Sequence, residues 1–216
     1  MIASTPAQLA ARDLFKLARI VPVVSVDDPA DGVALARALV AGGLPIVEMT
    51  LRSPNALAVI KAIAKAVPDA VLGVGTVMDK AQAAAALEAG ARFLVSPGVT
   101  PALAEVAASC PVPFLPGIAT VSEAMRLREM GFKTLKFFPA ESSGGIAALK
   151  GFLPVLPDIA FCPTGGIDAG KAPSYLALPN VVGLGGSWIA PAGLVKVRDF
   201  AAITMLARTA SAILPS

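Results

Sequence analysis

A lysine and a glutamate each stand in the middle of a short apolar run of this sequence. Glu48 lies in IVEMT, which covers residues 46–50, and Lys136 lies in TLKFF, which covers residues 134–138. Side chains of a β-strand alternate between its two faces. If the apolar residues on either side of each ionisable residue face a helical layer, then Glu48 and Lys136 both point to the opposite face, into the interior of a sheet.

An amine in an apolar interior is suited to nucleophilic chemistry. Desolvation disfavours the ammonium form of Lys136, which makes the neutral amine available to attack a carbonyl. The sequence contains no histidine, which excludes Ser/His and Cys/His nucleophile pairs and the usual ligands of a catalytic zinc. Glu48 is therefore the candidate proton shuttle for Lys136. In the alternative interpretation, Lys136 extends into solvent or forms a buried ion pair with Glu48 without catalytic use.

Two further features indicate binding of anions. Arg52 precedes Ser53-Pro54, the apparent cap and first turn of a helix, where a cation is unfavourable unless an anion binds beside it. A solvated surface arginine is the alternative. Glycine pairs end the last two predicted strands, in CPTGG at 162–166 and GLGGS at 183–187. Glycines also simply form turns, but two pairs in successive loops favour a phosphate site built from backbone N–H groups.

The elements that must position these residues are short β-branched runs alternating with Ala-rich helical stretches. Strands are predicted over residues 21–26, 46–49, 71–74, 93–95, 114–115, 134–138, 159–162 and 181–184. Helices are predicted to begin near Pro29, Pro54, Lys80, Pro101, Val121, Gly145 and Ala169. The expected cap residues are Asp28, Ser53, Asp79, Thr100, Thr120 and Asp168. Further helices are predicted over residues 6–18, which could cover one end of the sheet, and over about 198–213.

About eight strand–helix units favour a single (β/α)8 TIM barrel domain over residues 1–216, with an extra N-terminal helix. In a barrel the catalytic groups lie at the carboxyl ends of the strands. An open doubly wound sheet is the alternative, and no G-x-G-x-x-G motif follows the first predicted strand to support it.

Composition narrows the partners and the compartment. With 56% hydrophobic and 15% charged residues, the chain is too apolar for disorder, and its net charge of +3 comes without a basic run. The most apolar stretch, 181–195, is interrupted by glycine, serine and proline, and charges break up the N-terminal segment. We expect a cytoplasmic protein that binds neither membrane nor nucleic acid. Cys110 and Cys162 are expected to be reduced, buried thiols.

The sequence resembles the 2-keto-3-deoxy-6-phosphogluconate (KDPG) aldolases, the class I enzymes of the KDPG/KHG aldolase family. The resemblance lies in VEMTLRS, GVGTV, SPG, PGIATVSE, KFFPAE, FCPTGGI and GGSW, in order over most of the chain. KFFPAE together with FCPTGGI is the specific combination. The resemblance implies a Schiff-base lyase of the Entner–Doudoroff pathway that cleaves a phosphorylated keto acid to pyruvate and glyceraldehyde 3-phosphate. It also implies a homotrimer that needs no metal or other cofactor.

Carried over position by position, the resemblance implies that Lys136 forms the Schiff base and that Glu48 moves protons during imine formation and cleavage. The residues implied to hold the carboxylate and keto end of pyruvate are Arg52, Thr76 and Thr164. Those implied to hold the phosphate are Gly165, Gly166, Gly186 and Ser187. Those implied to line the pocket beside the imine are Pro97 and Phe138.

Three other functions compete with this one. A phosphosugar isomerase or epimerase would share the phosphate loops but has no use for an imine-forming Lys136. A non-catalytic binder of phosphorylated ligands would have no use for the inward pair of Lys136 and Glu48. A sister aldolase acting on 4-hydroxy-2-oxoglutarate or on 6-phosphogalactonate is the nearest rival, and FCPTGGI with Thr164 favours the gluconate substrate.

Overall fold

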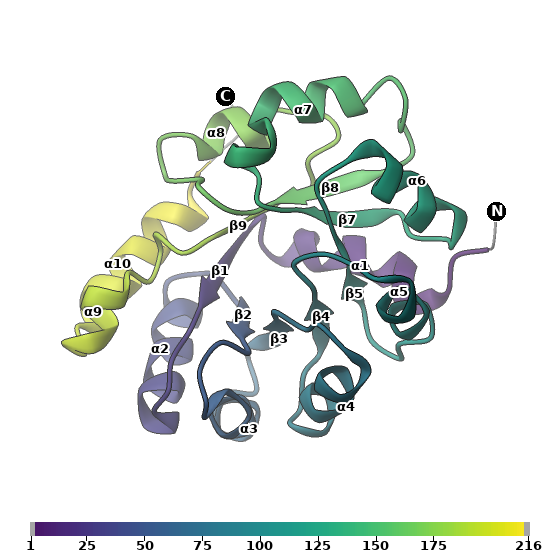
Figure 1. Cartoon of the computed structure of the whole chain (residues 1–216). Coiled ribbons are helices and arrows are strands. Elements are labelled where there is room, and N and C mark those ends of the chain that lie inside the picture. The colour runs from purple at the N-terminus through teal and green to yellow at the C-terminus, as the bar shows by residue number, and fades with distance from the viewer. Residues whose placement is uncertain (1–2, 214–216) are drawn as a thin grey trace.

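The computed structural model of the protein describes residues 3–213, in which parallel strands alternate with helices (Figure 1). The strands are β1 (Ile20–Val24), β2 (Ile46–Thr50), β3 (Val71–Gly75), β4 (Phe93–Val95), β5 (Phe114–Leu115), β6 (Gly117–Ile118), β7 (Thr134–Phe137), β8 (Ala160–Pro163) and β9 (Leu184–Gly186). The helices are α1 (Pro6–Leu17), α2 (Pro29–Ala41), α3 (Ala56–Ala66), α4 (Lys80–Glu88), α5 (Pro101–Ala108), α6 (Val121–Glu129), α7 (Gly145–Phe152), α8 (Ala172–Leu176), α9 (Ala192–Lys196) and α10 (Phe200–Ser211). A 3-10 turn, η1 (Glu141–Ser143), precedes α7.

The strands form a curled, wholly parallel arrangement in two hydrogen-bonded groups. One group has the order β5-β4-β3-β2-β1-β9, and the other has the order β6-β7-β8. Helices surround the strands in Figure 1. This is the α/β fold that the repeating strand–helix pattern predicted, and it brings the carboxyl ends of all strands to one side.

The first seven predicted strands match observed strands to within two residues at each end, and two regions differ further. The predicted fifth strand, over 114–115, is β5, but β6 was not predicted; it follows Pro116, which has no backbone N–H to donate. The eighth was predicted over 181–184, but β9 begins at Leu184 and reaches Gly186. The preceding residues pair only through an isolated bridge between Val181 and Phe161. The glycines that looked like a loop after the last strand therefore belong in part to the strand.

Ser53 does not cap a helix, contrary to the sequence prediction. Helix α3 begins at Ala56 rather than Pro54, and its cap, Asn55, makes no side-chain capping bond. The neighbouring loop supplies the acceptor, because Asp27 Oδ1 accepts from Asn55 N at 3.1 Å and from Ser53 Oγ at 2.5 Å. A capping acceptor from a distant loop leaves no local signature in the sequence, which is why the prediction was wrong.

Two more helix starts lie later than predicted. Helix α8 begins at Ala172, and Asp168 accepts from Lys171 N at 2.9 Å in the turn before it. The last helix, α10, begins at Phe200 after its cap Asp199, and the separate short helix α9 precedes it. The predicted caps of α2, α4, α5 and α6 are confirmed as side-chain acceptors, namely Asp28, Asp79, Thr100 and Thr120.

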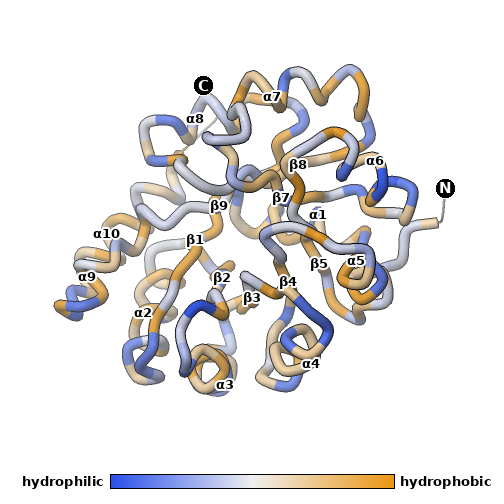
Figure 2. The backbone as a smooth tube through the Cα atoms, in the orientation of Figure 1, coloured by the Kyte–Doolittle hydropathy of each residue, from blue (hydrophilic) through white to orange (hydrophobic). Residues whose placement is uncertain are grey.

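The core has an outer and an inner layer. Between strands and helices, the outer layer includes Val47, Met49, Leu135 and Phe137, each with no exposed surface. These are the alternate positions that the strand pattern assigned to the helical side. Along the surrounding helices, hydrophobic and hydrophilic segments alternate, as expected for helices that cover a sheet with one face (Figure 2). Each such large apolar side chain contributes roughly 1.5–3 kcal/mol by its burial.

Helix α1 closes the inner layer at the amino ends of the strands. Leu14 and Phe15 pack there against side chains from several strands, including Val21, Ile46 and Phe93. The helix is held in place by Gln8, a buried residue whose amide donates to Met130 O at 3.2 Å. The prediction that an N-terminal helix covers one end is confirmed. Within residues 3–213, no helix combines the length and apolar character that a membrane crossing requires.

Candidate active site

Lys136 and Glu48 meet inside the curl of strands. Lys136 lies on β7 and Glu48 on β2, in different hydrogen-bonded groups, yet Nζ of the lysine donates to Oε1 of the glutamate at 3.1 Å. The side chains are only 6% and 5% exposed. The inward orientation of both residues is confirmed, and the alternative in which Lys136 extends into solvent is wrong.

The surroundings of this pair are mostly apolar and tightly packed. A cavity of about 10 Å³ beside Lys136 and Glu48 is lined by inward residues of the strands and by α1, which is close to the space that one water molecule needs. Cys162, on the strand next to β7, also lines it. Burial raises the pKa of its thiol to about 12. The thiol is therefore neutral, and Lys136 and Glu48 are the ionisable groups that remain for chemistry here.

Gly75 makes room for the carboxylate of Glu48. A Cβ atom at position 75 would lie 2.1 Å from Oε1 of Glu48 and 2.8 Å from its Cγ. Strand β3 can approach Glu48 this closely because residue 75 is a glycine, and a residue with a side chain there would clash with the carboxylate. Sequence reasoning quoted the GVGTV motif without assigning this role, since the close approach depends on β2 and β3 being neighbours in the sheet.

Arg52 is positioned by Thr50 rather than by a helix start. Its Nε donates to Thr50 Oγ1 at 3.0 Å, and the same hydroxyl donates to Val24 O at 3.1 Å. The sequence predicted that Arg52 lies directly before a helix start at Ser53-Pro54. This placement is wrong, because α3 begins only at Ala56. The guanidinium still lies just beyond the carboxyl end of β2, on an exposed residue, where it can meet an anion.

Thr76 follows β3 in a left-handed backbone conformation, with φ of 63°. Few residues other than glycine adopt this region, and it is least favourable for a β-branched side chain. The structure therefore places a strained threonine at the carboxyl end of β3, beside Gly75.

Thr164 lies at the carboxyl end of β8 and pairs with Gly185 of β9 through an isolated bridge. Its side chain is buried, and within residues 3–213 its Oγ1 has no hydrogen-bond partner. A buried hydroxyl without a partner costs free energy unless something binds it. A Cβ at Gly185 would lie 2.5 Å from this oxygen, so that glycine gives the hydroxyl its space.

The predicted phosphate loops have the backbone that the glycines suggested. Gly165 and Gly166 have φ of 104° and 78°, in the left-handed region that favours glycine. A Cβ at Gly186 would lie 1.6 Å from the ring of Trp188. Ser187, between them, is exposed. These loops follow β8 and end β9, on the same side as Thr164.

Phe138 lies beside the lysine, and Pro97 lies beside the strand that pairs with it. The ring centroid of Phe138 lies 5.3 Å from Lys136 Nζ. Gly117 pairs in register with Lys136, and a Cβ on it would lie 2.4 Å from the backbone of Pro97. The residues predicted to bind substrate therefore all end or follow strands, beyond Lys136 and Glu48 in the direction of the carboxyl ends.

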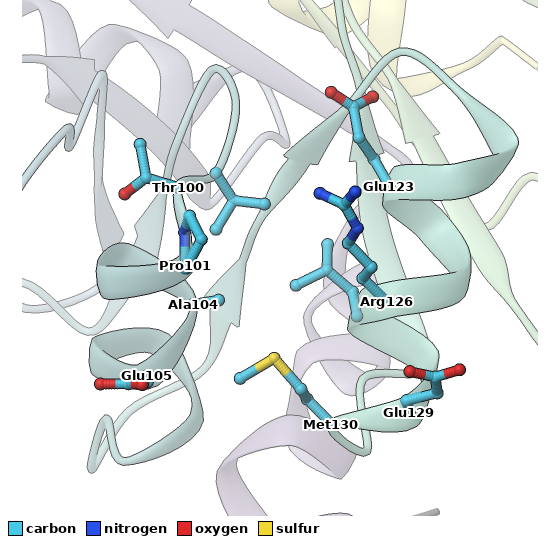
Figure 3. Close-up of a pocket in the computed structure, with 10 residues that line it drawn as sticks. Thr100, Pro101, Ala104, Glu105, Glu123, Arg126, Glu129 and Met130 are labelled. Carbon is cyan, nitrogen blue, oxygen red and sulfur yellow. The ribbon is translucent and has the colours of Figure 1, made fainter.

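A second hollow lies outside the strands. It has a volume of about 300 Å³ between α5 and α6, and Figure 3 shows Glu105 and Glu129 at its rim with Met130 between the helices. Lys136 and Glu48 do not line it. The groove carries acidic groups and one arginine, Arg126, rather than an inward amine, and we assign it no part in the chemistry.

A buried amine paired with a carboxylate, among parallel strands whose loops are rich in glycine, defines an α/β protein of the kind that performs covalent chemistry on carbonyls. Comparison with known proteins supports this class. The family described as KDPG and KHG aldolase matches residues 12–206. The chain therefore belongs to the KDPG and KHG aldolase family, whose members are lyases.

Similar proteins include the 2-dehydro-3-deoxy-phosphogluconate aldolase of Pseudoalteromonas atlantica, 46% identical over 95% of each chain. The KHG/KDPG aldolase of Escherichia coli K12 is 44% identical over 93% of this chain and 94% of its own. Among solved structures, the KDPG aldolase of Legionella pneumophila, with pyruvate captured as a covalent carbinolamine, has a TM-score of 0.91 at 40% identity, covering 94% of this chain and 98% of that one. The aldolase of Zymomonas mobilis ZM4 with 3-phosphoglycerate has a TM-score of 0.92 at 44% identity, covering 97% and 99%.

Proposed function

We propose that this protein is a class I aldolase that cleaves 2-dehydro-3-deoxy-6-phosphogluconate reversibly to pyruvate and glyceraldehyde 3-phosphate through a Schiff base on Lys136. The observation that carries the proposal is the enclosed contact of 3.1 Å between Lys136 Nζ and Glu48 Oε1. The relatives that are 40–46% identical and named 2-dehydro-3-deoxy-phosphogluconate aldolase support the choice of substrate.

The contact gives the amine and the acid that imine formation requires. Transfer of one proton from Lys136 to Glu48 produces a neutral nucleophile and a protonated acid side by side. The amine attacks the C2 ketone of the substrate to give a carbinolamine. Glu48, directly or through a water, then protonates the departing hydroxyl and leaves an iminium. The carbinolamine captured with pyruvate in the Legionella relative is the corresponding intermediate in that protein.

Cleavage follows from the iminium, which draws electrons from the neighbouring bond. Glu48, directly or through a water, removes the proton of the C4 hydroxyl. The C3–C4 bond breaks and glyceraldehyde 3-phosphate leaves. The two electrons of the broken bond remain in an enamine of pyruvate on Lys136. Protonation at C3 and hydrolysis of the resulting imine release pyruvate and restore the amine.

Charge and hydrogen-bonding capacity divide the site into two ends. Arg52 and Thr76, with the unpartnered hydroxyl of Thr164, would hold the pyruvate end. Gly165, Gly166, Gly186 and Ser187 would hold the phosphate through their loop N–H groups. Pro97 and Phe138 would pack on the apolar part of the substrate. With both ends held, the scissile bond is fixed near Lys136.

We also infer that the two groups of strands together make a (β/α)8 barrel. The bridges from Phe161 to Val181 and from Thr164 to Gly185 support this, because they link β8 to the β9 segment. Counting β5 and β6 as one interrupted strand then gives eight. On the family resemblance alone, we further propose a cytoplasmic homotrimer that acts in the Entner–Doudoroff pathway.

4-Hydroxy-2-oxoglutarate is a second candidate substrate. The Escherichia coli relative, 44% identical, is named KHG/KDPG aldolase. Cleavage of this acid also yields pyruvate, and the chemistry at Lys136 would be the same. The phosphogalactonate alternative has weaker support, since the structure named KDPGal is 27% identical.

Borohydride trapping tests the proposal directly. The protein is incubated with pyruvate and sodium borohydride, digested, and analysed by mass spectrometry. Reduction of the imine is expected to attach a pyruvate-derived group to the peptide that contains Lys136. Lys136→Ala should give no adduct and no cleavage, and Lys133→Ala, a half-buried lysine at the start of the same segment, should retain both. An adduct on another lysine would contradict the assignment.

A further inference from the structure

Glu141 connects the segment of the lysine to the two-glycine turn after β8. It begins η1, shortly after the end of β7. Its backbone N donates to Gly165 O at 3.1 Å. Its carboxylate accepts from the hydroxyl of Tyr175 at Oε1 and from Lys171 Nζ at Oε2, the latter at 2.6 Å. Lys171 Nζ also donates to Gly166 O at 3.0 Å.

These contacts fix the direction of two peptide groups. The carbonyls of Gly165 and Gly166 both point toward Glu141 and Lys171. Since C=O and N–H point in opposite directions in a trans peptide, the N–H groups of Gly166 and Ile167 point away from this cluster. Within residues 3–213, neither of these N–H groups has a protein acceptor. Successive free N–H groups in a turn of this kind form a concave site for anions.

The turn also rests directly on the side chain of Glu141. A Cβ on Gly166 would lie 2.8 Å from both Cβ and Cγ of Glu141. The hydroxyl of Tyr175, a residue with no exposed surface, meets the carboxylate from the other side. Glu141 is thereby held between a rigid core residue and the glycine turn, which distinguishes it from a freely moving surface ion pair.

We infer that Glu141 is a positioning residue for the phosphate of the substrate: together with Lys171 and Tyr175, it keeps the N–H groups of the Gly165-Gly166 turn directed at the phosphate. The inference rests on the proposed function and assigns a role to an acid that neither nucleophilic nor proton-transfer chemistry uses. Ion pairing supports it, because the bond from Lys171 lowers the pKa of Glu141 and Glu141 raises the pKa of Lys171. Both groups therefore stay charged at neutral pH.

The test separates the phosphate end from the pyruvate end. Exchange of the C3 protons of pyruvate for deuterium, followed by NMR, requires the imine chemistry but no phosphate. Cleavage of 2-dehydro-3-deoxy-6-phosphogluconate requires both ends of the site. Competitive inhibition by inorganic phosphate requires the phosphate end alone. We compare Glu141→Gln and Lys171→Met with Glu88→Gln, an exposed glutamate at the end of α4.

For Glu141→Gln, loss of the charge-assisted bonds is expected to raise KM for the phosphorylated substrate and the inhibition constant of phosphate by about tenfold. The rate of pyruvate exchange should change by less than about twofold, because Lys136 and Glu48 are not in contact with this cluster. Lys171→Met should act in the same direction, and Glu88→Gln should match the wild type. Circular dichroism verifies folding, and Lys171→Met carries the test if Glu141→Gln does not fold.

An unchanged KM in the folded variants would overturn the inference. So would an equal loss of pyruvate exchange and cleavage, since that is the result of general structural damage. Failure of the proposed function looks different: the wild-type protein itself would then show neither pyruvate exchange nor cleavage.

Discussion

The amine of Lys136 and the carboxylate of Glu48 lie 3.1 Å apart, although 88 residues separate them in the sequence. Each side chain comes from the centre of a strand whose alternate residues are packed under helices. The fold thus brings an acid and a base together in a space that is too small for more than about one water molecule. A proton that passes between Lys136 and Glu48 is therefore shielded from bulk solvent by the surrounding side chains.

Replacing Glu48 with glutamine tests the proton-transfer role. The amide still accepts a hydrogen bond from Lys136 but cannot take up its proton. Cleavage is expected to slow by about 10²- to 10⁴-fold, measured by coupling pyruvate release to lactate dehydrogenase. Borohydride trapping of pyruvate should become slower in parallel. A variant that is folded and retains the wild-type rate would assign proton transfer to another group.

Replacing Gly75 with alanine tests the space that Glu48 needs. The added Cβ would meet Oε1 of Glu48 at 2.1 Å, so the carboxylate must move away from Lys136. Misplacement on this scale is expected to reduce kcat by about 10- to 100-fold. Gly193→Ala is the matched control, because nothing lies within 4 Å of a Cβ there. Equal activity of the two variants in a steady-state assay would show that the position of the carboxylate is not critical.

Replacing Thr50 with valine tests the support of Arg52. The valine cannot accept the bond from Arg52 Nε, which measures 3.0 Å in the wild type. If Arg52 binds the carboxylate of pyruvate, the KM of pyruvate in the deuterium-exchange assay should rise by about three- to tenfold. Thr209→Val, at an exposed position of α10, should leave KM unchanged. A lower kcat with unchanged KM would speak against a binding role.

Replacing Asp158 with asparagine tests the stabilising role of a surface cluster. Asp158 accepts from Lys133 Nζ at 2.6 Å and from Arg128 Nε at 2.8 Å. Lys133 foremost, with Arg128, lowers the pKa of this carboxyl from 3.8 to about 2. Because the pKa is lower in the folded state, the stabilisation is fully present above 3.8 and is lost as the pH falls toward about 2.

For this partly exposed cluster, we expect Asp158→Asn to reduce the free energy of unfolding at neutral pH by about 1 kcal/mol, after allowing for solvent screening. Urea titrations of wild type and variant should converge as the pH is lowered. If the difference in free energy of unfolding between wild type and variant stays constant down to pH values near the folded-state pKa, the carboxylate charge is not its source.

The inward lysine and glutamate could be predicted from the sequence because strand alternation is a local pattern, and IVEMT and TLKFF each display it in five residues. The cap of α3 could not, since Asp27 reaches it from another loop. Nor could the roles of Gly75 and of Glu141, because each depends on which strand or turn becomes its neighbour. Sequence patterns therefore identified the inward pair of Lys136 and Glu48, while the contacts of Gly75 and Glu141 with their neighbours became visible only in three dimensions.

Helix α1, packed by Leu14 and Phe15, covers the amino ends of the strands, so a substrate has to approach Lys136 from their carboxyl ends. Under the proposed chemistry, the aldehyde must leave first on this side, since pyruvate is still covalently bound to Lys136. In the synthetic direction the order of binding is the reverse of the order of release, and pyruvate has to bind before the aldehyde.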